Sequence, residues 1–322
     1  FPPADLSGFY YANGLPCYYA RDALMVARAF MLAGHLPEAR QVIRYLLARK
    51  RKPSGEFYQR YDGHGRPAEG ANNAVFHQLD SIGYLLRIVC DFKQQTGELL
   101  TCLDDIGELA RVIIRAEKKF GLVGPEGGVN EGVFGPAFIV SSNMCIYGGL
   151  KAAAALLVDR AVAGDMIGVN KAILAGIEGA FVPAQGYCYG YVSYHDDLVM
   201  KYDTPQYFGL LYGFEDTKNM RKTHRMLLKN ASFEKDGIGY SEQEYHHGPW
   251  TFNTAACAQY AYKIGDFKTA LAKLNWLNEH ANEYGLMPEA FSADNPEQCY
   301  INPLVWACAE VVAALHVNGD KP

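Results

Sequence analysis

The sequence predicts an all-α fold, an (α/α)6 toroid built from helical hairpins. Apolar residues recur at helical spacing along nearly all of the 322 residues, and strand-like alternation is nearly absent. In addition, short and long connections alternate between the predicted helices, which is typical of hairpins arranged in a ring. We therefore expect one domain that covers residues 1–322.

The apolar pattern predicts eleven helices in order. The third shows it most clearly, because Val75, Leu79, Ile82, Leu86 and Val89 follow one another at spacings of four and three. The first stops at a glycine, and the second has a proline in its first turn. The predicted ranges are 22–34, 37–50, 73–95, 99–119, 138–158, 165–180, 204–212, 215–230, 249–264, 266–283 and 301–316.

The connections indicate how these helices are arranged. Short links make antiparallel neighbours, so all long loops should lie on one face of the ring. The first, third, fifth, seventh, ninth and eleventh helices, which follow the long loops, should form the inner ring. Eleven helices, with one more missing before the first, make six hairpins. The long connections are 1–20, 51–72, 120–137, 181–203, 231–248 and 284–300.

Composition excludes several classes of partner. The net charge of -5 and the pI near 6.0 argue against binding to nucleic acid or an anionic membrane. No apolar run approaches the ~20 residues that a membrane span needs. Eight scattered cysteines indicate reduced thiols in a cytoplasmic protein. The 22 tyrosines, many of them in long loops, suit a sugar ligand.

Two carboxylates stand out because each precedes a predicted inner helix. Glu131 lies in a glycine-rich loop before the helix 138–158, and Glu289 lies in GLMPEAF before the last helix. One protonated and one ionised carboxylate on either side of a sugar is the usual requirement for glycoside hydrolysis. A lone loop glutamate is more often simply solvated. Glu126 competes with Glu131 for the acid role, but it lies farther from the helix.

At these residues the chain resembles glycoside hydrolase family 15, the glucoamylase-like inverting exo-glucosidases. The resemblance covers about residues 19–316 and rests on order and spacing, since each motif alone is weak. Trp306 follows Glu289 as a tryptophan follows the base in the family's final helix. The matching segments are Tyr19-Ala20-Arg21-Asp22, His77-Gln78-Leu79-Asp80, Glu131 through Ser142 to Leu150, Gly248-Pro249-Trp250, and Glu289.

The resemblance implies a reaction and a set of roles. Glucose would be released with inversion from the non-reducing end of α-1,4- or α-1,6-linked oligosaccharides, without a cofactor or metal. Glu131 would be the general acid and Glu289 the general base, while Arg21 and Asp22 hold the terminal sugar. The other substrate-binding positions implied are Tyr19, Gln78, Asp80, Asn130, Tyr240, Trp250 and Trp306.

The sequence departs from the family at three places. Asn130 and Tyr19 stand where the family has tryptophan, and no arginine accompanies Tyr240. These positions concern the sugar platform, so they affect the substrate more than the reaction. Because Asn130 and Tyr19 are smaller than tryptophan, we expect a pocket for one or two sugar rings. The tyrosine-rich loops 186–203 and 237–250 and Trp306 should form its walls.

Two other interpretations stay open. The chain could be a non-catalytic carbohydrate-binding or regulatory (α/α) domain, or a toroid hydrolase that acts on another sugar, such as a uronic acid. The pair His246-His247 does not predict a metal site, because adjacent histidines point apart.

For an inverting site, the carboxyls of Glu131 and Glu289 should stand ~6.5–9.5 Å apart. Its apolar setting should raise the pKa of Glu131.

Overall fold

Eleven helices form the frame of the computed structural model, which describes residues 11–12, 15–68, 77–129, 134–233, 237–242, 246–295 and 297–319. Every helix that the apolar pattern predicts is present among these residues. The helices are α1 (Ala20–Leu32), α2 (Leu36–Leu47), α3 (Asp80–Thr96), α4 (Leu103–Arg115), α5 (Val140–Leu156), α6 (Ala161–Gly179), α7 (Gln206–Leu211), α8 (Lys218–Asn230), α9 (Thr251–Lys263), α10 (Phe267–His280) and α11 (Val305–Gly319).

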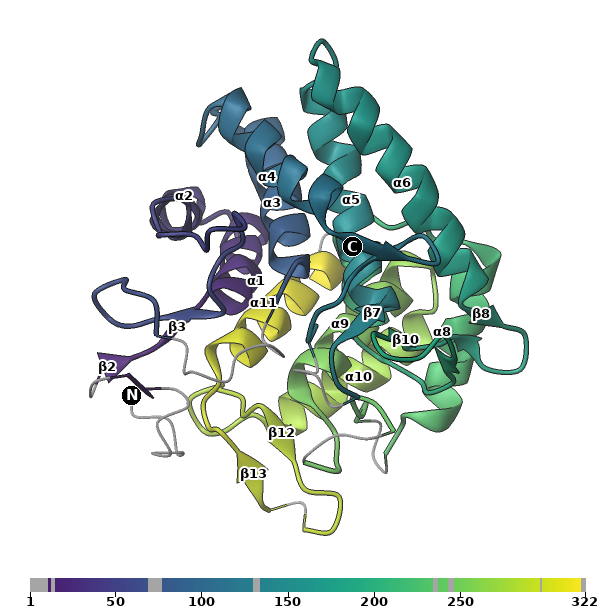
Figure 1. Cartoon of the computed structure of the whole chain (residues 1–322). Coiled ribbons are helices and arrows are strands. Elements are labelled where there is room, and N and C mark those ends of the chain that lie inside the picture. The colour runs from purple at the N-terminus through teal and green to yellow at the C-terminus, as the bar shows by residue number, and fades with distance from the viewer. Residues whose placement is uncertain are drawn as a thin grey trace.

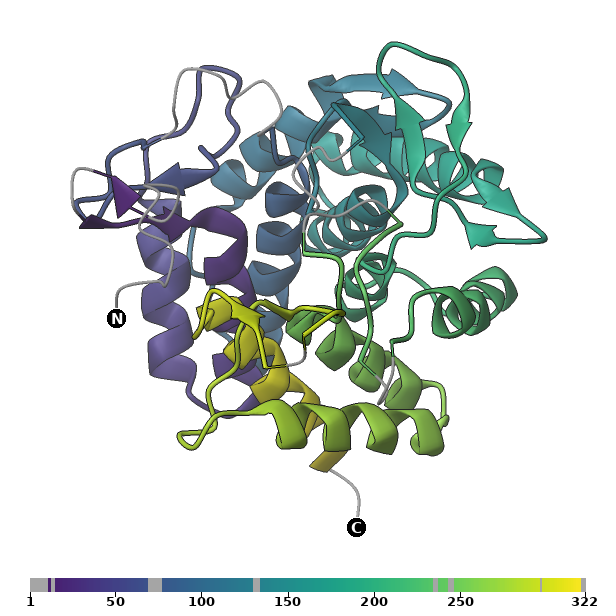
Figure 2. The same cartoon turned by 90° about the horizontal axis from the view of Figure 1, so that it is seen from below.

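The odd-numbered helices form a closed inner ring. Each contacts the next, from α1 through α3, α5, α7 and α9 to α11, and α11 contacts α1. In Figure 2 the purple α1 and the yellow α11 lie side by side, although they come from opposite ends of the chain. Most residues of α5 and α9 are buried, and both helices contain many small side chains, as burial on several sides requires. The predicted inner ring is confirmed.

The even-numbered helices lie outside this ring. α2 packs on α1, α6 on α5 and α10 on α9, while α4 touches α3, α5 and α6. Each of these helices has one buried stripe and one exposed face, as a helix with a solvent side requires. Side chains cap three of them at the N-terminus. The capping residues are Cys102 for α4, Thr217 for α8 and Asp266 for α10.

Glycines allow three inner helices to approach closely. A Cβ atom on Gly149 of α5 would lie 2.2 Å from the carbonyl oxygen of Gly83 in α3. A Cβ atom on Gly148 would lie 2.1 Å from the carbonyl oxygen of Tyr212, just after α7. The Gly148-Gly149 pair therefore sets the spacing of α3, α5 and α7.

Short strands, which the sequence analysis did not predict, lie mainly in the long loops. They are two or three residues long and pair antiparallel, so the fold remains helical. They are β1 (Tyr11–Ala12), β2 (Leu15–Pro16), β3 (Tyr18–Tyr19), β4 (Arg60–Tyr61), β5 (Glu117–Lys119), β6 (Leu122–Gly124), β7 (Ala137–Ile139), β8 (Phe181–Val182), β9 (Gly186–Tyr187), β10 (Gly190–Val192), β11 (Leu198–Val199), β12 (Ala290–Phe291) and β13 (Cys299–Tyr300).

Backbone pairing joins the long loops to one another around the ring. β3 pairs with β4, and β7 pairs with β10, so each pairing connects two successive long loops. Gly127 N donates to His77 O, again between neighbouring loops. Isolated bridges continue the series, from Asp203 to Ser241 and from Trp250 to Ala290. The long loops therefore share one face, as predicted, while the α3–α4 and α5–α6 turns stand at the far end (Figure 1).

Several predicted helix ends differ from the observed ones, and two of them have a clear physical reason. The third helix begins at Asp80, and residues 77–79 are not helical; residues 73–76 of that prediction lie outside the described part. The fourth ends at Arg115, because Glu117–Lys119 pair with Leu122–Gly124 instead of extending the helix. Pairing with a neighbouring strand outweighs the helical preference of Glu-Lys-Lys.

Candidate functional site

Glu289 lies on the face of the ring that carries the long loops, and main-chain hydrogen bonds hold both its N–H and its carbonyl group. Its N–H donates to the carbonyl oxygens of Tyr300 and Ile301, at 3.0 and 3.1 Å. Its carbonyl oxygen accepts from Thr251 N, at 3.0 Å, in the first turn of α9. The side chain is 8% exposed. The carboxylate is therefore held by rigid elements and is nearly removed from bulk water.

His246 is a partner of this carboxylate. Its Nε2 lies 3.2 Å from Oε2 of Glu289, and its side chain is 12% exposed. The imidazole ring stacks on Tyr300, with centroids 4.0 Å apart and an angle of 15° between the planes. On another side it lies against Trp250, at 5.0 Å. The sequence did not predict this contact, because His246 and Glu289 are 43 residues apart in the chain.

Asp22, in the first turn of α1, brings a second carboxyl toward Glu289. Burial raises the pKa of Asp22 to about 7, the guanidinium of Arg21 opposes this rise, and the charge of Glu289 adds to it. Part of Asp22 remains exposed. A neighbouring negative charge disfavours the ionisation of a second carboxyl. Near neutral pH, Asp22 can therefore hold a proton.

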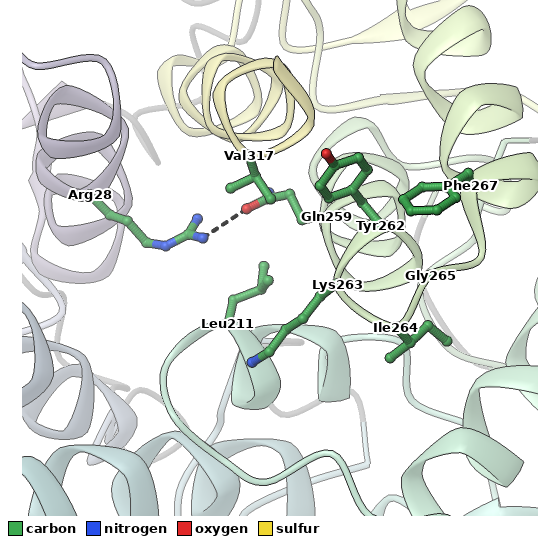
Figure 3. A pocket seen from close by; sticks show the side chains of 9 residues that line it. All are labelled: Arg28, Leu211, Gln259, Tyr262, Lys263, Ile264, Gly265, Phe267 and Val317. Carbon is green, nitrogen blue, oxygen red and sulfur yellow. Dashed lines mark hydrogen bonds between the residues drawn. The ribbon is translucent and has the colours of Figure 1, made fainter. Parts of the chain in front are cut away.

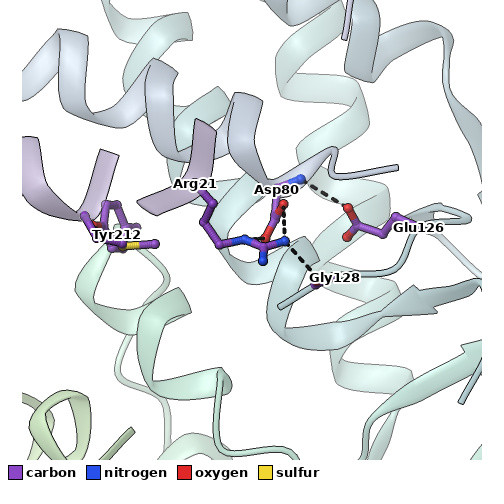
Figure 4. Close-up of polar contacts among 6 residues, drawn as sticks. Arg21, Asp80, Glu126, Gly128 and Tyr212 are labelled. Atoms are coloured by element: carbon purple, nitrogen blue, oxygen red, sulfur yellow. Dashed lines mark hydrogen bonds and ion pairs between the residues drawn. The ribbon is translucent and has the colours of Figure 1, made fainter. Parts of the chain in front are cut away.

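Arg21 is buried and connects two inner helices with a loop (Figure 4). Its Nε and Nη2 donate to the two carboxylate oxygens of Asp80, at 2.9 and 3.3 Å. Nη2 also donates to Gly128 O, at 2.8 Å. Arg21 thereby ties α1 to the start of α3 and to the loop before α5. Asp80 is fully buried, so it supports the wall of the site without forming its surface.

Glu126, the rival acid, is also fully buried. Its Oε2 accepts from the backbone N–H of Asp80, at 3.2 Å. Burial and the neighbouring Asp80 raise the pKa of Glu126 to about 8. A carboxyl without any exposed surface cannot reach a glycosidic oxygen. We therefore assign Glu126 to the support of the loop and not to the acid role.

Gly128 fixes the loop that leads to Glu131. Its φ of +60° is unfavourable for residues with a side chain, and a Cβ atom there would lie 2.5 Å from Ile139 Cδ1. Glu131 and Asn130 themselves lie outside the described residues, as does the distance between the carboxyls of Glu131 and Glu289. The described residues on either side fix the loop at both ends, at Gly128 and at β7.

The remaining predicted site residues surround this centre at different depths. Tyr19 is partly exposed, and its hydroxyl accepts from Arg60, at 3.3 Å. Gln78 is buried just before α3. Tyr240 and Trp250 are buried and stack on each other, with centroids 4.6 Å apart. Trp306 is buried and stacks on Phe252, at 4.0 Å. Burial places these three aromatic rings, like Asp80, behind the surface of the site.

A hollow of about 650 Å³ lies away from these residues, near the ends of α1, α7, α9 and α11 (Figure 3). Arg28 donates to Gln259 there, at 2.8 Å, and Lys263 donates to Leu210 O, at 3.3 Å. Arg28 also lies 3.7 Å from the carboxylate of Glu310. Lys263 lies in the last turn of α9, where a basic side chain balances the partial negative charge of the helix C-terminus. These cations therefore have a structural explanation, and we assign no ligand to this hollow.

Two further searches concern the described residues only. They contain no group of three or more His, Cys, Asp or Glu side chains placed to hold a metal ion. No helix among them is long and apolar enough to span a membrane. All eight cysteines are free thiols.

Comparison with known proteins relates the fold to glycosidases. Neither a protein-family model nor a curated protein matches the sequence. Among solved structures, a variant glycosidase in complex with glucose has a TM-score of 0.76 at 16% identity, over 95% of this chain and 89% of that one. A bacterial glucoamylase with acarbose has a TM-score of 0.75 at 17% identity, over 94% of this chain and 49% of that one.

A third structure shows that the same fold serves another sugar. A metal-independent α-mannosidase of Streptococcus pneumoniae, with α-1,6-mannobiose, has a TM-score of 0.66 at 16% identity, over 95% of this chain and 87% of that one. At such identities the likeness concerns the fold and leaves the substrate open. The chain has the (α/α)6 toroid fold of these glycosidases.

Proposed function

We propose that the protein is an inverting glycoside hydrolase that releases glucose from the non-reducing end of α-linked oligosaccharides. The observation that carries this proposal is Glu289, a nearly buried carboxylate held on the loop face beside Asp22 and His246. Glycosidases of known structure share the toroid around it. The sequence resemblance places both candidate carboxylates in the order that the glucoamylase-like family has.

In this mechanism Glu289 is the general base. It takes a proton from water as the water attacks the anomeric carbon, while Glu131 protonates the departing glycosidic oxygen. Asp22, which is partly exposed and can hold a proton, would bind a hydroxyl of the terminal sugar. Arg21 would act through its bonds to Asp80 and Gly128, which fix the position of the loop before Glu131. The site would need no cofactor.

The two carboxylates give the direct test. Glu289→Gln and Glu131→Gln should each lower kcat at least ~10²-fold, the usual scale of general acid–base catalysis. Thermal unfolding should change little, since glutamine keeps the shape of the side chain. Glu297→Gln, at an exposed acid near β13, is the control and should keep full activity. Near-normal turnover in either active-site variant would remove that residue from the mechanism.

The substrate is tested with maltose, isomaltose, trehalose and longer maltodextrins, with the anomer of the released glucose followed by NMR. Inversion predicts that β-glucose appears first from an α-linked substrate. A short pocket predicts that disaccharides react at least as fast as long dextrins. Much faster turnover of long dextrins would contradict the pocket expected from Tyr19 and Asn130.

A second candidate substrate is an α-mannoside. The fold likeness to an α-mannosidase supports it, and so do the two tryptophan positions at which this chain departs from the glucoamylase pattern. Including α-1,6-mannobiose in the same assay separates the two sugars. Sugar binding by calorimetry without any turnover would instead favour a non-catalytic binding domain.

A further inference from the structure

We infer that His246 is the positioning residue for Glu289: it donates a hydrogen bond that orients the carboxylate and keeps the negative charge on it. This inference rests on the proposed function of Glu289 as general base. It adds a residue that neither the sequence pattern nor the fold comparison assigns.

Geometry supports a donor on His246. The two side chains approach at 3.2 Å between Nε2 and Oε2, and both are almost buried. An ionised carboxylate can only accept hydrogen bonds, so Nε2 must carry the proton. A hydrogen bond to an ionised acceptor is stronger than one between neutral groups, because the charge attracts the donor proton.

The imidazole ring is itself fixed in place. It stacks on Tyr300 and lies against Trp250, so its plane cannot rotate freely. Tyr300 belongs to β13, which pairs with β12 opposite Ala290, the residue after Glu289. Trp250 is bridged to the same Ala290. Both aromatic neighbours of His246 are thus attached to the segment that carries Glu289.

This arrangement constrains the side chain of Glu289, whose torsions χ1, χ2 and χ3 are not set by the main-chain bonds. Main-chain bonds hold its N–H and carbonyl oxygen, but they do not set the rotation of the carboxylate. A hydrogen bond to Oε2 restricts these torsions, and therefore the directions in which Oε1 can present its lone pairs. A general base must present those lone pairs to the attacking water.

His246 also determines which of two neighbouring carboxyls is charged. Asp22 lies close enough for the charge of Glu289 to raise the pKa of Asp22. With both side chains poorly solvated, one carboxyl is favoured as the anion. The donor on His246 stabilises the anion at Glu289, while the proton stays on Asp22. The general base is then ready in the ground state.

The test compares two substitutions at His246. Glutamine can place its Nε2 donor near the position of the imidazole Nε2, whereas leucine fills similar space without a donor. His246→Leu should lower kcat about tenfold to a hundredfold with KM almost unchanged, as expected for loss of a hydrogen bond to a charged group. His246→Gln should restore most of that loss. Thermal unfolding of both variants monitors any structural damage.

Each outcome is decisive. Full activity in His246→Leu, or equal loss in the leucine and glutamine variants at equal stability, overturns the positioning role. Inactivity of Glu289→Gln alongside full activity of His246→Leu would refute only this inference. Full activity of Glu289→Gln would refute the proposed function itself.

A second measurement needs no substrate. In the parent protein, NMR should detect a slowly exchanging imidazole N–H that disappears in His246→Gln and is therefore assigned to His246. In Glu289→Ala this signal should be lost to exchange with water, because its acceptor is gone. A signal that persists unchanged in Glu289→Ala would show that the two side chains are not bonded.

Discussion

At the scale of single residues, the site depends on carboxyls whose charge is set by burial. Glu126 has no exposed surface, while Asp22 and Glu289 lie close to each other and keep some contact with solvent. The sequence analysis proposed Glu289 and Asp22 from motifs that resemble a known family, and the structure brings the two side chains near enough for their charges to interact. The sequence could not reveal His246 or the buried state of Glu126, since both depend on partners that lie far away in the chain.

Glu126 predicts a pH dependence of stability. The folded protein keeps its proton up to about pH 8, whereas the unfolded chain releases it near 4.5. Between these values the folded state binds more protons, so the free energy of unfolding falls as pH rises. Glu126→Gln, which cannot ionise, should lose less stability between pH 5 and 8 than the parent, by on the order of one to a few kcal/mol.

Urea unfolding at a series of pH values measures this difference. Below pH 4 Glu126 is protonated in both states, so the stabilities of the two proteins should change with pH in parallel there. Parallel curves over the whole range would show that Glu126 does not carry the expected proton.

Gly128 predicts a link between backbone strain and activity. Gly128→Ala should cost about 1–2 kcal/mol for the left-handed conformation. It should also lower kcat, because the new Cβ atom meets Ile139 and displaces the loop before Glu131. Gly97→Ala is the control, since Gly97 has a similar φ of +76° and nothing within 4 Å. The control should lose stability but keep its turnover, and equal turnover in both variants would contradict this account.

At the scale of elements, periodicity predicted every helix but not every boundary. The apolar stripes of α3 and α5 come from local sequence, so their presence is readable from the chain alone. Strand pairs such as β5 with β6 form between segments that carry no alternating pattern, and they depend on the surrounding loops. The end of α4 was therefore predicted too late. α7, predicted over 204–212, is six residues long, from Gln206 to Leu211.

The contact between α3 and α5 gives a prediction for helix packing. Gly149→Ala should destabilise the protein by ~1–3 kcal/mol, because its Cβ atom would meet the backbone of Gly83 and cannot be relieved by a rotamer change. Gly168→Ala is the matched control, in α6, with nothing within 4 Å. It should stabilise by roughly 0.5–1 kcal/mol, the usual difference between glycine and alanine in a helix. Thermal or urea unfolding of both variants tests the opposite signs.

At the scale of the whole molecule, the inner ring is complete only when α11 lies between α9 and α1. A chain that ends at Asn302 keeps ten of the described helices but loses buried Trp306, Ala307 and Ala314. We expect this chain to unfold without a sharp calorimetric transition and to bind a dye for exposed apolar surface. A chain that ends at Gly319 serves as the control. A cooperative transition in the shorter chain would show that the ring is stable when open.

Ring closure also has a consequence for biosynthesis. Domains emerge from the ribosome N-terminus first, at about 5–20 residues per second. The side of α1 that α11 covers must therefore wait roughly 15 to 60 seconds for its partner, which comes from the other end of the chain. During that time the nascent protein carries an open apolar edge. This edge is where a chaperone would bind, and where two unfinished chains would aggregate.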